Sequence, residues 1–131
     1  MKIQYVKIGK RTFALAFTLD AMATMTDMIQ DFDLSQVATY ARTPRGLGDL
    51  VYCLAQQGEL LEGRSIDVDR AWIGAHLSPA PAKAAKVQIA VLTALADGLN
   101  METDDEEKGE VDEVLEEIKK KGTPGASPSE P

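Results

Sequence analysis

One segment of this 131-residue chain constrains its architecture most: Lys7-Ile8-Gly9-Lys10-Arg11-Thr12-Phe13-Ala14-Leu15-Ala16-Phe17-Thr18-Leu19. Bulky and small side chains alternate over 12–18, which predicts a strand with one bulky apolar face. A second strand is predicted at 2–8, and the glycine that opens the connection between the two is typical of a tight β-hairpin. Two strands alone are marginally stable in water, so we expect the bulky face to pack on the helices that follow.

The first of these helices is predicted at 19–30, because Thr18 is a good N-cap residue and apolar side chains then recur at helical spacing. Its buried stripe is predicted to comprise Leu19, Met22, Met25, Thr26 and Ile29. Asp33, with a glutamine three residues later, indicates a short second helix that ends near Arg42. We expect the turn-forming run Thr43-Pro44-Arg45-Gly46 to terminate that helix.

Three more helices are predicted further along the chain. The first spans 46–57 and is followed by a loop bracketed by Gly58 and Gly63; the second starts at Ser65 or Asp67; the third spans 79–99, from Ser78-Pro79 to Gly98 or Asn100. Their buried faces are predicted to be Leu47, Leu50, Val51 and Leu54, then Val68, Ala71, Trp72 and Ala75, then Val87, Ala90, Val91, Ala94 and Leu95. The predicted fold class is therefore mainly α, with a short N-terminal β-hairpin packed on a bundle of about five small helices.

Charge divides the chain into a compact domain at 1–100 and an acidic tail at 101–131. The first hundred residues carry ten basic and ten acidic side chains, whereas the tail carries four lysines and eleven acidic residues. The whole formal charge of −7 therefore lies in the tail. A neutral domain with an acidic tail repels phosphate backbones, so we expect no nucleic-acid partner.

The tail itself has three parts: an acidic linker at 102–107, a candidate amphipathic helix at 110–121, and a Pro/Ser/Gly-rich end predicted to be disordered. An apolar stripe at spacing i, i+3, i+4 and i+7 runs along the middle part. It consists of Val111, Val114, Leu115 and Ile118, our predicted partner-binding residues. A helix of this length is marginal in isolation, so it either docks on the compact domain or folds against a partner.

The sequence offers little for catalysis or for cofactor binding. His76 and Cys53 are the only histidine and cysteine, and no third residue suggests a nucleophile–base arrangement with them. We expect Cys53 to be a buried structural thiol, Asp67-Val68-Asp69 to start a helix, and Asp104 to Glu107 to be a solvated charge run. No catalytic residue, cofactor or metal ligand is predicted, and the chain is not expected to be an enzyme. With no signal-peptide-like start and no apolar span of membrane length, it is expected in the cytoplasm.

The order of these parts resembles one protein family. A short hairpin runs from Lys7 through Phe13 and Leu19 directly into a helix; several small helices and then an acidic stretch follow within about 130 residues. In this arrangement the chain is similar to the tail assembly chaperones encoded by long-tailed bacteriophages and prophages. The resemblance covers the whole chain in architecture, is carried mainly by residues 3–30, and rests on a pattern without a unique motif.

The resemblance implies a role in virion assembly in the bacterial host cytoplasm. Such chaperones bind the tape measure protein, a long helical chain, and keep it soluble until the tail tube polymerises around it. The implied partner is the tape measure protein, with the tail tube protein as a second candidate; no membrane partner is expected, and a homo-oligomer is compatible with this role, as are several copies along one client. Two other interpretations stay open: a minor structural protein of the tail or head–tail connector, and a small acidic inhibitor or antitoxin-like binding protein.

Overall fold

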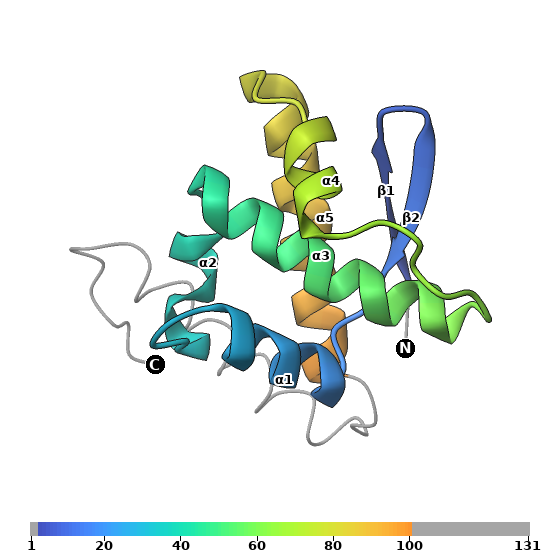
Figure 1. The fold of residues 1–131 in the computed structure, drawn as a ribbon. Helices are drawn as coiled ribbons and strands as arrows, with labels where there is room; N and C mark the ends of the chain where they lie inside the picture. The colour runs from blue at the N-terminus through green and yellow to red at the C-terminus, as the bar shows by residue number, and fades with distance from the viewer. Residues whose placement is uncertain (1–2, 101–131) are drawn as a thin grey trace.

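The computed structural model describes residues 3–100, which form a mainly helical fold with an N-terminal antiparallel hairpin packed against the helices (Figure 1). The hairpin comprises β1 (Gln4–Ile8) and β2 (Arg11–Leu15); the helices are α1 (Leu19–Met28), α2 (Val37–Tyr40), α3 (Pro44–Leu61), α4 (Arg70–His76) and α5 (Pro81–Asn100), with a 3-10 turn at Leu34–Gln36 before α2. The central element is α3, which packs against β2 and every other α-helix. The predicted fold class is confirmed.

The hairpin pairs Gln4 with Leu15 and Ile8 with Arg11, and Gly9 adopts a positive φ of 63° in the connecting turn. This conformation suits a residue without a β-carbon. The second strand ends at Leu15, three residues earlier than predicted. Leu15 pairs with Gln4, the first residue of β1, so the ladder ends there; the N–H of Ala16 points to the outer edge of β2 and donates to the carbonyl of Leu54 on α3 at 3.1 Å.

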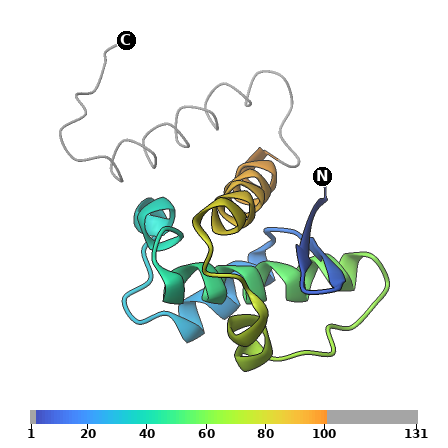
Figure 2. The same ribbon diagram turned by 90° about the horizontal axis from the view of Figure 1, so that it is seen from above.

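The prediction of one bulky face on β2 was too simple, because both faces of this strand are covered. Phe13, Leu15 and Phe17 are buried as expected, but Ala14 and Ala16 are buried as completely. Both α3 and α5 pack against β2, and Figure 2 shows the hairpin beside these two helices. The alternation along β2 therefore places large side chains on one buried face and small side chains on the other. It does not distinguish a buried face from a solvent-exposed one.

Thr43 begins α3, where the sequence suggested the end of the preceding helix. Its hydroxyl accepts a hydrogen bond from the N–H of Gly46 at 2.9 Å, and Pro44 occupies the first helical turn. Proline is tolerated there because its missing N–H would have no partner in the helix. The helix then continues to Leu61, past its predicted end at 57, so Gly58 lies inside it and not in a loop.

Gly58 lets α3 approach β2 closely: a β-carbon at this position would overlap the backbone carbonyl of Ala14. The predicted stripe of α3 is confirmed, since all four of its members are buried: Leu47, Leu50, Val51 and Leu54. Burial of these side chains against the hairpin and four helices forms the centre of the core.

The predicted cap of α1 is confirmed, because the Thr18 hydroxyl accepts a hydrogen bond from the N–H of Ala21 at 3.1 Å. Its stripe was partly wrong. Met25 and Ile29 are buried, but Leu19 is 80% exposed. Thr26 is exposed as well, and the small Ala21 is the buried residue in the first turn of α1.

The remaining helices start later than predicted. Asp33 caps the turn before α2 by accepting from the N–H of Ser35 at 3.0 Å, and Asp69, not Ser65 or Asp67, caps α4 by accepting from the N–H of Trp72 at 2.9 Å. The buried face of α4 is also different: Ile73 is fully buried, while Ala71 and Ala75 are exposed, because packing against α3 decides which side of α4 is covered.

Pro81 begins α5, two residues after the predicted start, and Ser78 instead accepts a hydrogen bond from the N–H of Ala80 in the preceding turn. Four of the five predicted core residues of α5 are buried: Val87, Val91, Ala94 and Leu95. Gly98 does not stop the helix. It lies within α5, where a β-carbon would overlap Phe17. The predicted linker, amphipathic helix and disordered end of the tail lie outside the described residues.

Candidate binding groove

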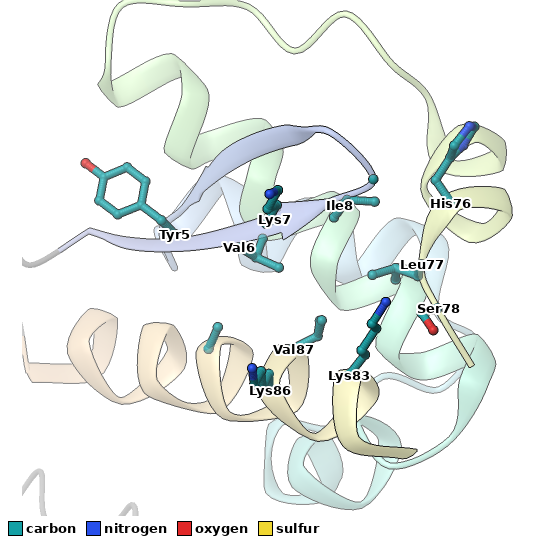
Figure 3. Close-up of a pocket in the computed structure, with 12 residues that line it drawn as sticks. Tyr5, Val6, Lys7, Ile8, His76, Leu77, Ser78, Lys83, Lys86 and Val87 are labelled. Atoms are coloured by element: carbon teal, nitrogen blue, oxygen red, sulfur yellow. The ribbon is translucent and has the colours of Figure 1, made fainter. Parts of the chain in front are cut away.

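A groove with a volume of about 590 Å³ lies between β1 and the first half of α5 (Figure 3). Three segments line it: Tyr5 to Gly9 of the hairpin, His76 to Ser78 at the end of α4 and just after it, and Lys83, Lys86, Val87 and Ala90 of α5. These segments meet because α5 packs along β1. The hydrogen bond from Gln4 Nε2 to Asp97 Oδ2, at 2.9 Å, joins the first residue of β1 to the C-terminal part of α5.

The floor of the groove is apolar. On β1 the side chains alternate, so Val6 and Ile8 are buried while Tyr5 and Lys7 are exposed. On α5, Val87 is buried and Ala90 half-buried one turn further on. Leu77 closes the floor from the segment after α4. Such a floor suits the apolar side chains of another polypeptide.

The charged groups of the groove are all basic. Lys7 comes from β1 and Lys83 and Lys86 from α5, and no Asp or Glu among residues 3–100 contributes to the lining. In Figure 3, Lys83 extends from α5 toward the hairpin across the mouth of the groove. Lys7 extends from the side of β1 opposite Val6 and Ile8, so the basic margin of the groove is formed mainly by Lys83 and Lys86 of α5. This margin favours a ligand that carries carboxylates beside an apolar surface.

The other polar side chains of the groove have local partners. His76 is exposed; its ring stacks on Trp72 at a centroid distance of 4.0 Å, and its Nδ1 lies 2.8 Å from the Trp72 carbonyl oxygen. Because that oxygen can only accept, Nδ1 carries the proton in this contact. Ser78 accepts from the N–H of Ala80. Within the part of the chain that the structure describes, no hydrogen bond to a carboxylate orients either side chain as a base or a nucleophile.

Cys53 lies elsewhere, in the core. Its thiol is fully buried and donates a weak hydrogen bond to the sulfur of Met28 at 3.6 Å. Burial raises the pKa of this thiol to about 12, with a smaller contribution from the negative charge of Asp49. A thiol in this state is a poor nucleophile, and its hydrogen bond goes to Met28 and not to His76. The predicted structural role of Cys53 is confirmed.

Two buried carboxylates were not singled out from the sequence. Asp49 accepts from the hydroxyl of Tyr40 at 2.7 Å and from Nε of Arg70 at 2.6 Å. Burial and the hydrogen bond to Asp49 raise the pKa of Tyr40 to about 12. The Arg70 guanidinium lies over Gly48, where a β-carbon would collide with it. The Gly46-Leu47-Gly48 run therefore serves helix packing within α3.

The second buried carboxylate, Glu59, links α3 to β2 and to Arg64. Its Oε2 accepts from the N–H of Ala14 at 2.8 Å, and its Oε1 accepts from Nε of Arg64 at 2.8 Å. The Arg64 guanidinium and the Ala14 N–H lower the pKa of Glu59, although burial opposes this. Both buried carboxylates thus have structural partners. Among residues 3–100, no three His, Cys, Asp or Glu side chains form a group that could hold a metal ion.

The sequence-predicted binding residues Val111, Val114, Leu115 and Ile118 lie outside the described residues, whereas the groove residues were missed. Lys83 and Lys86 are three positions apart, which places them on one side of a helix and gave a weak signal. Nothing in the sequence connects Lys7 with them, because only the packing of β1 on α5 brings the three together.

No protein-family model matches the chain, and comparisons with curated proteins and with solved structures find no match either. Within residues 3–100, every helix falls short of the length or the apolar character needed to cross a bilayer.

Proposed function

We propose that this chain is a tail assembly chaperone of a long-tailed bacteriophage or prophage, which binds the tape measure protein and keeps it soluble until the tail tube forms. The groove between β1 and α5 is the observation that carries the proposal. It offers a helical client an apolar floor formed by Val6, Ile8 and Val87 and a basic margin at Lys83 and Lys86. The architectural resemblance of the sequence supports the same role.

The groove suits a helix better than a small metabolite. It is open, and the polar groups other than the lysines are already engaged in local hydrogen bonds. Small-molecule sites instead need several polar groups that converge on one ligand. An amphipathic client helix places apolar residues on the floor at spacing i, i+3, i+4 and i+7, with acidic residues beside the lysines.

A small groove also gives the affinity that the role requires. One contact of this size is weak, because stable protein interfaces bury far more surface than such a groove provides. Many copies along one long client hold it by multivalency, and each copy can be displaced as tube subunits polymerise. A non-catalytic binding role is part of the proposal.

Co-expression tests the proposal. The tape measure protein from the same phage or prophage is expressed with and without this chain, and its soluble fraction is measured after centrifugation. We expect the chain to raise that fraction several-fold, and Lys83→Glu to abolish most of the gain. Lys10→Glu is the matched control, since it makes the same charge change on an exposed turn outside the groove. A tape measure protein that stays equally insoluble with the wild-type chain overturns the proposal.

Mass spectrometry of purified virions separates this role from that of a minor structural protein. A chaperone is depleted from the finished particle, whereas a structural protein is retained in fixed copy number. Recovery of this chain in virions at the stoichiometry of known minor tail proteins contradicts the chaperone proposal.

A further inference from the structure

Charge changes along the side of α5 that packs on β1, from the groove to the C-terminal end of the helix beyond it. Lys83 and Lys86 lie in the first turns of α5, beside the Gly9 end of β1. At the other end of the helix, Asp97 accepts the hydrogen bond from Gln4. The strand therefore runs antiparallel to α5, and the surface changes from basic to acidic along the helix from its N-terminus to its C-terminus.

One segment of the chain has the opposite order of charge. Residues 110–117 carry five acidic side chains, whereas 119–121 is a run of three lysines. The same segment carries the apolar stripe of Val111, Val114, Leu115 and Ile118. We propose that residues 110–121 dock in the groove as a helix parallel to α5, with their apolar stripe on its floor. The acidic half then faces Lys83 and Lys86, and the lysine run faces Asp97.

The length of the intervening chain permits this direction. From Asn100 back to Lys83 is about 25 Å along α5, at 1.5 Å per helical residue. The nine residues 101–109 span up to about 30 Å when extended, so residue 110 reaches the level of Lys83. A helix at 110–121 then covers about 18 Å and brings its lysines to the level of Asp97.

The opposite direction is electrostatically unfavourable. An antiparallel segment would place Lys119 to Lys121 beside Lys83 and Lys86, and Glu110 beside Asp97. Like charges in contact are destabilising, and opposite charges determine the direction in which paired helices associate. The direction of docking is therefore a specific and measurable consequence of the charge order.

A docked tail segment competes with the client for the groove. This regulatory consequence rests on the proposed client-binding function, whereas the docking itself does not. A tail that occupies the groove shields its apolar floor before a client arrives, and lowers the apparent client affinity by the fraction of groove that is occupied. A tight client displaces the tail, and the released acidic segment then lies free beside the complex.

Paramagnetic relaxation in the client-free, full-length protein tests the docking. Spin labels are attached to Gly109→Cys and, in a second protein, to Gly122→Cys; the buried Cys53, with its raised pKa, stays unlabelled. We expect the label at 109 to broaden most strongly the amide signals near Lys86, and the label at 122 those near Asp97. The reverse pattern, or uniform signals in both proteins, overturns the proposal.

Charge exchange gives the matched control. Glu110→Lys with Glu113→Lys is expected to abolish the broadening, and addition of Lys83→Glu with Lys86→Glu is expected to restore it. The pair Glu106→Lys with Glu107→Lys makes the same charge change in the linker and is expected to leave the broadening in place. If the broadening does not return in the variant with all four substitutions, charge pairing does not position the segment. That result overturns the proposed parallel direction of docking.

A mixing experiment identifies which chain supplies the tail. Spin-labelled protein without ¹⁵N is mixed with unlabelled ¹⁵N protein. Broadening in this mixture shows a tail from a second copy in the groove and overturns intrachain docking. The outcome is independent of the client: if the tape measure protein does not bind while the broadening persists, the docking stands and the proposed function fails.

Discussion

The carboxylate of Glu59 on α3 accepts a hydrogen bond from the backbone N–H of Ala14 on β2, at 2.8 Å. One turn earlier on α3, the Leu54 carbonyl accepts from the N–H of Ala16. A helix thus pairs with the outer edge of β2, where a larger sheet would place a third strand. An open strand edge invites association with other chains, and here α3 closes it.

Glu59→Ala removes this closure and is expected to lower the free energy of unfolding by about 2 kcal/mol. The main cause is the Ala14 N–H, which stays buried and loses its partner. Arg64 contributes less, because its side chain is half exposed and regains water when the ion pair is lost. Urea denaturation followed by circular dichroism measures the change.

Glu62→Ala is the control for this substitution. Glu62 lies 3.5 Å from the same Arg64 guanidinium but on the surface, where water screens an ion pair and leaves it little effect on stability. An equal loss in the two variants would show that Arg64 pairing, and not closure of the strand edge, is what Glu59 supplies.

The lowered pKa of Glu59 also predicts a dependence of stability on pH. A carboxylate with a lower pKa in the folded state stabilises the fold above its unfolded-state pKa, and this contribution is lost as pH falls through the folded-state value. We therefore expect stability to decline as pH falls below the ordinary glutamate value of 4.5. Glu59→Gln should flatten this decline in thermal melts between pH 6 and pH 3. An unchanged slope contradicts the assignment.

Gly58 makes a second prediction about the same interface. Alanine normally stabilises a helix interior relative to glycine by about 0.5–1 kcal/mol. Here its β-carbon would overlap the Ala14 carbonyl, so we expect Gly58→Ala to destabilise the domain by about 1–3 kcal/mol instead. Gln56→Ala, at a half-buried position on the same helix, is the control and should change stability little. A stabilised Gly58→Ala protein would show that α3 can move away from β2 without cost.

The sequence predicted those features that depend on local periodicity. The hairpin, the Thr18 and Asp33 caps, and the stripe of α3 all follow from spacing within a few residues, and each is confirmed. Fold class followed from the same patterns, because bulky strand residues and helical stripes need one another for burial.

The errors arose where long-range packing decides the local structure. Gly58 and Gly98 appear as helix breakers in the sequence, but each is a point where a helix approaches the backbone of β2 or the residues after it. The groove was missed for the same reason. Lys7 is separated from Lys83 by most of the domain, and only the tertiary contact of β1 with α5 brings them into one lining.

Cys53 provides a test of core integrity. A buried thiol whose pKa is raised to about 12 is nearly all protonated at neutral pH, so a disulfide reagent should modify it only through unfolded molecules. We expect modification at pH 7 to be slower by at least 100-fold than that of a cysteine placed at exposed Lys10, and equal to it in urea. Rapid modification in native conditions would show that the contact with Met28 opens frequently.

A double substitution in the tail distinguishes two roles for the segment at 110–121: direct contact with the client, and competition with the client for the groove. Leu115→Asp with Ile118→Asp removes the apolar stripe of the segment at 110–121. If these residues contact the client directly, as the sequence alone suggested, the affinity for the tape measure protein falls. If they occupy the groove as a competitor, the variant frees the groove and the affinity for the tape measure protein rises; we expect a gain of about fivefold to tenfold.

Isothermal titration with a solubilised fragment of the tape measure protein measures whether this affinity rises or falls. Leu61→Asp, at an exposed apolar position outside the groove, is the control for the added charge. A weaker client complex in the double variant would contradict the competitive role and restore the direct one.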